Sequence, residues 1–334
     1  MIDFFFTLDY EIYGNGTGSL KDLIYEPGER LREIFRKWDA PLVAFVEVAE
    51  LKKIDEYGTD LAIGQVKRQI ETFYRNGFEI ALHLHPQWCN ARFEHGAWSL
   101  DYSEYNLCAL PRARISEIVE SSLDYLRETV GDSDFVPISF RAGNWLFQPT
   151  ETAASVLASK GLRIDSSVFK GGLQTGQSLD YRSSLNNGYY WHFSGDVTKP
   201  DSHGTWVEVP IYTRMVPFWK MPTSKRMGFS GGLGMGGQNL KGKLNRLRDL
   251  ARPLYPLKLD FCRMTLDELT SSMKRIMRED KCDPAAYKPV VAIGHTKDLT
   301  DAQTVDDFLS FLRTNHIQVS TFRSALSSLQ KGIA

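Results

Sequence analysis

Apolar residues follow two different periods along the chain. Short, nearly unbroken apolar runs are typical of buried parallel strands, whereas apolar residues three and four positions apart are typical of helices with one buried face. We expect strands at residues 1–11, 41–48, 78–85, 136–141, 162–165, 289–294 and 317–320, and helices at residues 26–38, 62–76, 112–130, 150–159, 266–278, 301–313 and from 322 onward. Strands that alternate with helices predict an α/β fold built on a parallel sheet or barrel.

The alternation of strands and helices lapses in the middle of the chain. Residues 178–201 are rich in Asn, Gly, Ser and Tyr, and the strand expected at 204–212 contains Pro210, which favours an edge or irregular position. Regular structure returns near residue 266. Since no repeat and no linker separates the two parts, we expect a single domain over residues 1–334, with a large insertion at about 170–288.

Composition narrows the class of protein. The chain has 334 residues, 42% of them hydrophobic, which is enough for a sizeable core. Its 40 basic and 41 acidic residues give a formal charge of -1, so no overall attraction to nucleic acid is expected. The four cysteines lack metal-type spacing, and no signal peptide or apolar run of membrane length is found. These features predict a protein of the cytoplasm.

Ionisable residues gather where the first and third predicted strands end. Asp9 and Glu11 close the first strand, and His83 and His85 close the third. Residues two apart on a strand point to the same side, and the carboxyl ends of parallel strands meet at one edge of a sheet. Glu11, His83 and His85 would supply one oxygen and two nitrogens to a divalent metal, most often zinc, and leave a position open for water or substrate. Taken alone, the histidine pair could equally be bonded to backbone.

Five short motifs occur in an order that resembles the polysaccharide deacetylase (NodB homology) family. They are Asp9-x-Glu11, the segment 79–85 ending in His83-x-His85, the Arg141-containing segment 140–145, the Asp165-containing segment 164–167 and the His295-containing segment 293–296. The similarity covers residues 1–168 and about 289–325. It implies a distorted (β/α)7 barrel and a metal-dependent carbohydrate esterase-type hydrolase that removes N- or O-acetyl groups from sugars.

The resemblance also implies a role for each matching residue. Asp9 corresponds to the general base, Arg141 to the arginine that pairs with it, and His295 to a protonated general acid oriented by Asp165. Glu11, His83 and His85 correspond to the metal ligands. The chain departs from the family pattern in two places: Asp-Tyr-Glu replaces adjacent aspartates, and His-x-His replaces His-x-x-x-His, so that His85 comes from the strand itself. Tyr10, between the two acids, is expected in the core.

Two tryptophans next to the motifs are candidates for the wall of a sugar-binding cleft. Trp145 follows Arg141, and Trp88 follows His85. Aromatic rings at such positions often stack on sugar faces, although core packing is the alternative.

A basic segment lies inside the predicted insertion. Residues 214–258 hold ten Lys or Arg against one acid, Asp249, and include a glycine-rich run at 228–237. Such a segment could bind the diphosphate of a nucleotide sugar or a polyprenyl-linked sugar. Residues 240–255 also have the pattern of a basic amphipathic helix that could lie on the inner membrane face, and a solvated helix over the insertion is the alternative.

The sequence therefore predicts a metal-dependent deacetylase that acts on a sugar or glycan precursor in surface polysaccharide biosynthesis. Two alternatives stay open. The same barrel could hydrolyse another amide, such as a formyl group on a lipid-linked amino sugar, or it could bind carbohydrate without catalysis.

Overall fold

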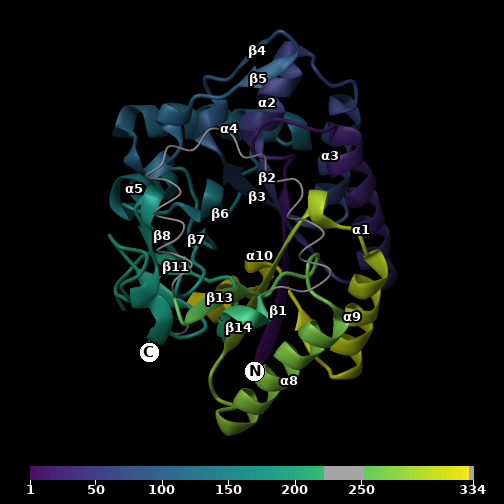
Figure 1. Ribbon diagram of the computed structural model, residues 1–334, viewed down its shortest axis with the longest axis vertical. Coiled ribbons are helices and arrows are strands. Elements are labelled where there is room, and N and C mark those ends of the chain that lie inside the picture. The colour runs from purple at the N-terminus through teal and green to yellow at the C-terminus, as the bar shows by residue number, and fades with distance from the viewer. Residues whose placement is uncertain (222–251, 331–334) are drawn as a thin grey trace.

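The computed structural model describes residues 1–221 and 252–330, and a curled, mainly parallel sheet forms its centre. Figure 1 shows helices arranged around the outside of this sheet, with β1 deep inside it. The strand order is β10-β11-β7-β6-β3-β2-β1-β14, and β15 also pairs with β1. The strands are β1 (Ile2–Tyr10), β2 (Val43–Glu47), β3 (Glu79–Leu84), β6 (Ser139–Ala142), β7 (Ile164–Asp165), β10 (Trp191–Phe193), β11 (Trp206–Glu208), β14 (Lys288–His295) and β15 (Gln318–Val319). This arrangement confirms the predicted class, an α/β fold of the polysaccharide deacetylase barrel type.

The helices agree closely with the apolar pattern. They are α1 (Glu26–Lys37), α2 (Val48–Tyr57), α3 (Ile63–Arg75), α4 (Arg112–Val130), α5 (Thr150–Ser159), α8 (Leu266–Cys282), α9 (Ala302–Thr314) and α10 (Phe322–Gln330). Sequence analysis did not predict α2, nor the single π-helical turn Lys21–Tyr25 that leads into α1. The pattern hides α2 because the helix begins at Val48 directly after β2 ends at Glu47, with no turn residues between them.

The middle of the chain is more than an insertion, because parts of it belong to the sheet. β11 pairs with β7 in parallel, and isolated parallel pairings join Phe169 to Ile211, Ile211 to Val291 and Asp260 to Ile293. These pairings bridge the gap between the β7 side of the sheet and β14. A two-stranded ribbon, β12 (Thr213–Pro217) with β13 (Leu254–Lys258), leads back into this wall.

Small antiparallel hairpins complete the described structure. They are β4 (Arg92–Glu94) with β5 (Ala97–Ser99), and β8 (Leu173–Gln174) with β9 (Leu179–Asp180). The glycine-rich run and most of the predicted basic helix lie outside the described residues. In the two described parts of the chain, no helix is both long enough and apolar enough to cross a membrane.

Phenylalanine rings of β1 fill the core on both sides of the sheet. Phe6 is fully buried, and its ring centroid lies 4.7 to 5.9 Å from those of Phe4, Phe35, Phe261 and Phe308. These rings come from four separate parts of the fold. Packing of this kind holds β1 rigidly, and β1 carries the first site residues.

Replacement of Phe6 tests this role of β1. The change Phe6→Ala should lower the free energy of unfolding by about 3–5 kcal/mol, because it removes a fully buried ring and leaves a cavity. Urea unfolding followed by fluorescence measures the loss. Leu61→Ala, at a side chain that is 98% exposed, is the control and should change stability little. Equal stability of both variants would contradict the packing described here.

Candidate metal and hydrolase site

Five parallel strands bring four of the predicted site residues, together with Glu47, to one level of the sheet. In the strand register, Asp9 of β1 is opposite His295 of β14, and His83 of β3 is opposite both Glu47 of β2 and Arg141 of β6. The side chains of Asp9, Glu47, His83 and Arg141 are almost entirely buried, and that of His295 is 12% exposed. The register alone therefore assembles ionisable groups from separate parts of the sequence at the carboxyl ends of the strands.

Glu11, His83 and His85 form a compact group of possible metal ligands. Glu11 Oε2 lies 2.9 Å from His85 Nε2 and 3.4 Å from His83 Nε2, and one ligand atom from each residue falls within 4.8 Å of the others. The prediction that these three side chains converge is confirmed. Two imidazoles and one carboxylate, with further positions open, are the donor set of a catalytic divalent site.

The second nitrogen of each histidine shows how the group could hold a metal. His83 Nδ1 lies 2.8 Å from the carbonyl oxygen of Arg141, which can only accept, so Nδ1 donates and the Nε2 lone pair faces Glu11. His85 Nδ1 has the side-chain amide of Gln87 at 3.2 Å, and Gln87 Oε1 is buried with no hydrogen-bond partner among residues 1–221 and 252–330. If this amide turns over, its oxygen accepts from His85 Nδ1 and the Nε2 lone pair becomes available. The residues present therefore fit a divalent ion.

Two buried glutamates that the sequence analysis missed hold the strand ends in place. Glu47 Oε1 accepts from the backbone N–H of His85 at 2.7 Å, and Glu50 Oε1 accepts from the N–H of Ile12 at 2.8 Å. Burial raises the pKa of Glu47 to about 8 and raises that of Glu50. They help to fix the backbone next to Glu11 and His85. The available signal was that Glu47 ends β2 and that Glu50 follows it in the first turn of α2.

Asp9 has a guanidinium as its direct partner, as predicted. Arg141 Nη1 donates to Asp9 Oδ1 at 2.5 Å, and its other nitrogens donate to Thr7 Oγ1 and to Ser166. Burial by itself raises the pKa of Asp9, but the charge of Arg141, helped by His83, outweighs it and holds the pKa below its usual value. Asp9 is therefore ionised at neutral pH and has one oxygen free of the arginine.

His295 lies between two carboxylates, and one of them differs from the prediction. Its Nε2 is 3.5 Å from Asp9 Oδ2, and its Nδ1 is 3.4 Å from Asp298 Oδ2. Arg263 Nε in turn donates to Asp298 at 2.7 Å. Burial lowers the pKa of His295 to about 4 despite these acids. That the ring is protonated as a general acid stays a prediction.

Asp165 does not take the predicted role of orienting His295. It is fully buried on β7, where its carboxylate accepts from the side chain and backbone N–H of Ser167. Burial raises the pKa of both Asp165 and its neighbour Glu208. Asp165 is part of the support beneath Arg141, and Asp298 stands beside His295 in its place.

The two tryptophans have different environments. Trp88 is only 1% exposed and packs edge-on against Trp98, so the prediction that it lines an open cleft is wrong. Trp145 is partly exposed, and Lys258 Nζ lies 3.1 Å from the centroid of its ring. Tyr10 is fully buried, as expected.

Lys297 is a site residue that the sequence analysis did not identify. Its Nζ donates to Glu11 Oε1 at 2.7 Å and to the carbonyl of Ile12 at 2.8 Å. Burial on its own raises the pKa of Glu11, but Lys297, followed by His85, holds it well below its usual value. One oxygen of Glu11 is thus paired with an ammonium, and the other faces the histidines. The two-residue spacing from His295 was the signal that could have indicated Lys297.

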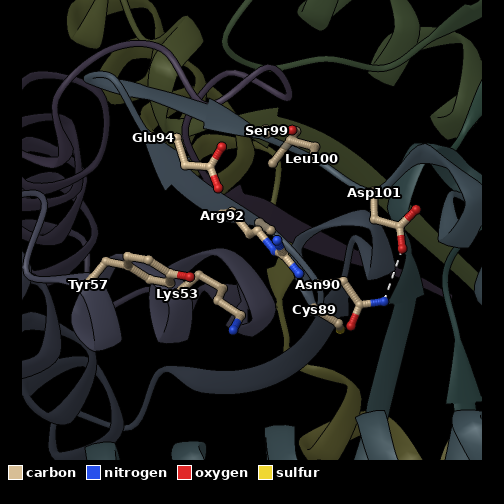
Figure 2. Close-up of a pocket in the computed structure, with 10 residues that line it drawn as sticks. Lys53, Tyr57, Cys89, Asn90, Arg92, Glu94, Ser99, Leu100 and Asp101 are labelled. Atoms are coloured by element: carbon tan, nitrogen blue, oxygen red, sulfur yellow. Dashed lines mark hydrogen bonds between the residues drawn. The ribbon is translucent and has the colours of Figure 1, made fainter.

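A polar pocket of about 740 Å³ lies beside the segment that follows His85. Figure 2 shows Lys53 and Arg92 approaching the same space, with Asn90 hydrogen-bonded to Asp101 at 3.0 Å. Tyr57 of α2 also lines it. The ten residues that line this pocket include none of the acids, histidines or arginine of the site.

Comparisons with known proteins identify the fold. A comparison with models of known protein families gave no match, and neither did one with curated protein sequences. Among solved structures, a protein from Mycobacterium smegmatis assigned to the polysaccharide deacetylases shares 15% identity at a TM-score of 0.57, over 99% of this chain and 90% of that one. The chain thus has the barrel fold of polysaccharide deacetylase structures.

Other solved structures with the same fold have different names. An allantoinase shares 14% identity at a TM-score of 0.51, over 98% of this chain and 89% of that one. A GH57 branching enzyme from Thermococcus kodakaraensis shares 11% identity at a TM-score of 0.54, over 98% of this chain and 70% of that one. At such low identity the comparisons show the fold, and the reaction has to be argued from the site.

Replacement of Gly143 tests the position of the His85 side chain. A Cβ at this position would lie 2.4 Å from the carbonyl oxygen of Leu84 and 2.8 Å from His85 Cγ. Gly143→Ala should therefore displace the imidazole and weaken the binding of Co²⁺ at least tenfold, as measured by absorption titration. In the control, Gly64→Ala, the nearest atom to the new Cβ is 3.6 Å away and Co²⁺ binding should be unchanged. Equal Co²⁺ affinity in both variants would mean that His85 is not held as described.

Proposed function

We propose that this chain is a metal-dependent hydrolase that removes an N- or O-acetyl group from a sugar or glycan precursor. One observation carries the proposal: a buried carboxylate and two imidazoles converge next to a second carboxylate, Asp9, which is kept ionised by Arg141. The polysaccharide deacetylase fold supports the choice of reaction. The choice of a sugar as substrate rests on that fold.

Glu11, His83 and His85 would hold the metal. A divalent ion in such a set polarises an acyl oxygen and lowers the pKa of water. Lys297 and the backbone support from Glu47 keep the carboxylate and His85 in place before any ion arrives. We propose zinc as the ion.

Asp9 would act as the general base. Its Oδ1 is occupied by Arg141, which leaves Oδ2 to accept a proton from the attacking water. Since Arg141 also bonds Thr7 and Ser166, its charge cannot swing away from Asp9. The arginine therefore orients the base and keeps it ionised.

His295 would act as the general acid. Its Nε2 is 3.5 Å from Asp9 Oδ2, so the proton taken by Asp9 can pass to His295. The Asp298 carboxylate, anchored by Arg263, faces the other ring nitrogen and stabilises the resulting imidazolium. The ring then donates to the departing nitrogen or oxygen of the sugar, which would otherwise leave as an anion.

Hydrolysis of another C–N bond is the second candidate. The allantoinase with this fold favours it, because the chain aligns with nearly the whole of that protein. A deformylase acting on a lipid-linked amino sugar belongs to the same candidate. Release of formate or opening of an amide ring, without release of acetate, would decide for it. Sugar binding without any product would instead indicate a carbohydrate-binding protein.

We further propose the compartment in which the substrate is found and the group to which its sugar is attached. A cytoplasmic sugar precursor attached to a nucleotide or polyprenyl diphosphate would bring negative charge near the basic segment predicted at 214–258. Peripheral contact of residues 240–255 with the inner membrane face belongs to the same proposal. Acetate release from free and diphosphate-linked acetamido sugars, compared with and without anionic vesicles, tests both points.

Loss of the base is the first test of the mechanism. Asp9→Asn should lower kcat for acetate release by about 10²–10⁴-fold, because the amide cannot take the proton. Elemental analysis should find the same metal content as in the unchanged chain. Asp134→Asn, at an exposed position away from the site, is the control. Normal acetate release by the Asp9 variant would exclude Asp9 as the base.

Loss of the carboxylate ligand is the second test. Glu11→Ala should lose most of the bound metal and all measurable acetate release, since only two imidazoles remain in the set. Elemental analysis after gel filtration measures the first effect, with Glu151→Ala on α5 as the control. Full metal content in the Glu11 variant would place the metal elsewhere.

A further inference from the structure

Lys258 enters the site from the ribbon in the middle of the chain. It is the last residue of β13, and the next residue, Leu259, hydrogen-bonds through its backbone to Tyr212 and Ile293 in the wall of the barrel. Lys258 thus stands where the ribbon joins the barrel wall. The sequence places it 37 residues before His295, as the last residue of the basic segment 214–258 and outside the five motifs of the family resemblance.

Aromatic rings surround the Lys258 ammonium. Its Nζ lies 3.1 Å from the ring centroid of Trp145 and 4.9 Å from that of Phe169. No acceptor or carboxylate of residues 1–221 or 252–330 forms a hydrogen bond or ion pair with it. Burial lowers the pKa of Lys258 to about 7, against the attraction of Asp260. Lys258 is partly buried, so its ammonium keeps donors that a ligand could satisfy.

The backbone at Trp145 is strained, and hydrogen bonds hold it in this conformation. Its φ is 61° and that of Asn144 is 53°, the left-handed region that bulky side chains avoid. The hydroxyl of Tyr181 donates to the Trp145 carbonyl at 2.5 Å and accepts from the N–H of Phe147. The ring that cradles Lys258 is therefore fixed by its own loop before any ligand arrives.

The ring beneath the Lys258 ammonium belongs to the segment that carries Arg141. Trp145 follows Arg141 by four residues, in the turn Gly143–Trp145 that directly follows β6. Asp9 and Arg141 form an ion pair with each other. The charge of neither residue is therefore left to balance the charge of a group bound at Lys258. An acceptor on the substrate could meet Lys258 while its acyl group lies next to Asp9.

We propose that Lys258 binds an anionic group, a carboxylate or a phosphate, on the sugar that carries the acyl group. This inference rests on the proposed hydrolase function and narrows its substrate class to acidic sugars or sugar phosphates. A lysine suits this task as a compact point charge with three donors. A neutral sugar would leave the ammonium with weaker acceptors.

Substrate selectivity tests the proposal. N-acetylglucosamine, its 1-phosphate and N-acetylglucosaminuronic acid are compared in acetate release by the unchanged chain, Lys258→Met and Lys258→Arg. Lys258→Met should lower kcat/KM for one or both anionic substrates about 10- to 100-fold, the effect of one hydrogen bond to a charged group, and leave that for the neutral sugar within twofold. Lys258→Arg should retain part of the preference, and Lys274→Met on α8 should behave as the unchanged chain. The substrate that suffers the larger loss identifies phosphate or carboxylate.

A loss of equal size for the neutral and anionic substrates would overturn the proposal, as would no loss at all. Binding of inorganic phosphate and of glucuronate to the metal-free chain, measured by calorimetry with glucose for comparison, separates this inference from the hydrolase proposal. Anion binding that disappears in Lys258→Met, without any acetate release, would support the anion site and exclude the deacetylase. Acetate release that is the same with and without Lys258 would support the deacetylase and exclude the anion site.

Discussion

The burial of two carboxylates at the end of β1 is the constraint on which the site depends. Asp9 and Glu11 are almost inaccessible to solvent and two residues apart. Two buried negative charges at this distance repel each other and lose their hydration, so each needs a cationic partner. Arg141 neutralises Asp9, and Lys297 neutralises one oxygen of Glu11. The remaining oxygen of Glu11 faces two imidazoles, which is where a divalent ion would complete the balance of charge.

Sequence reasoning recovered most of the fold and the central part of the site. The buried apolar runs and helical periods located the parallel strands, and the alternation of side chains along β1 and β3 placed the acids and histidines on common sides. Arg141 pairs with Asp9, as the family resemblance implied, although β3 and β2 lie between β6 and β1 in the sheet. The apolar runs and the alternation of side chains are local in sequence, whereas this pair spans the curled sheet.

Contacts that depend on long loops could not be predicted from apolar runs or from the alternation of side chains. Asp298 replaces Asp165 beside His295 because it lies in the turn that directly follows β14, whereas Asp165 is buried beneath the arginine. Trp88 turned inward against Trp98, which depends on a hairpin that no period predicts. Lys258 reaches the site only because the ribbon of β12 and β13 returns to the barrel wall.

One barrel supports several reactions, so the groups at the strand ends determine the chemistry. Here a carboxylate paired with an arginine, a histidine between two acids and a possible metal set occupy those ends together. Lys258, on the ring of Trp145, comes from the middle of the chain, where irregular segments complete the barrel wall.

X-ray absorption spectroscopy at the zinc edge tests the central claim most directly. The account predicts about one zinc ion per chain, with two imidazole nitrogens and at least one carboxylate oxygen in the first coordination sphere, and loss of the imidazole signal when His83 and His85 are replaced by alanine. A chain that retains no stoichiometric zinc, cobalt or nickel, or an ion whose spectrum is unchanged by those replacements, would contradict it.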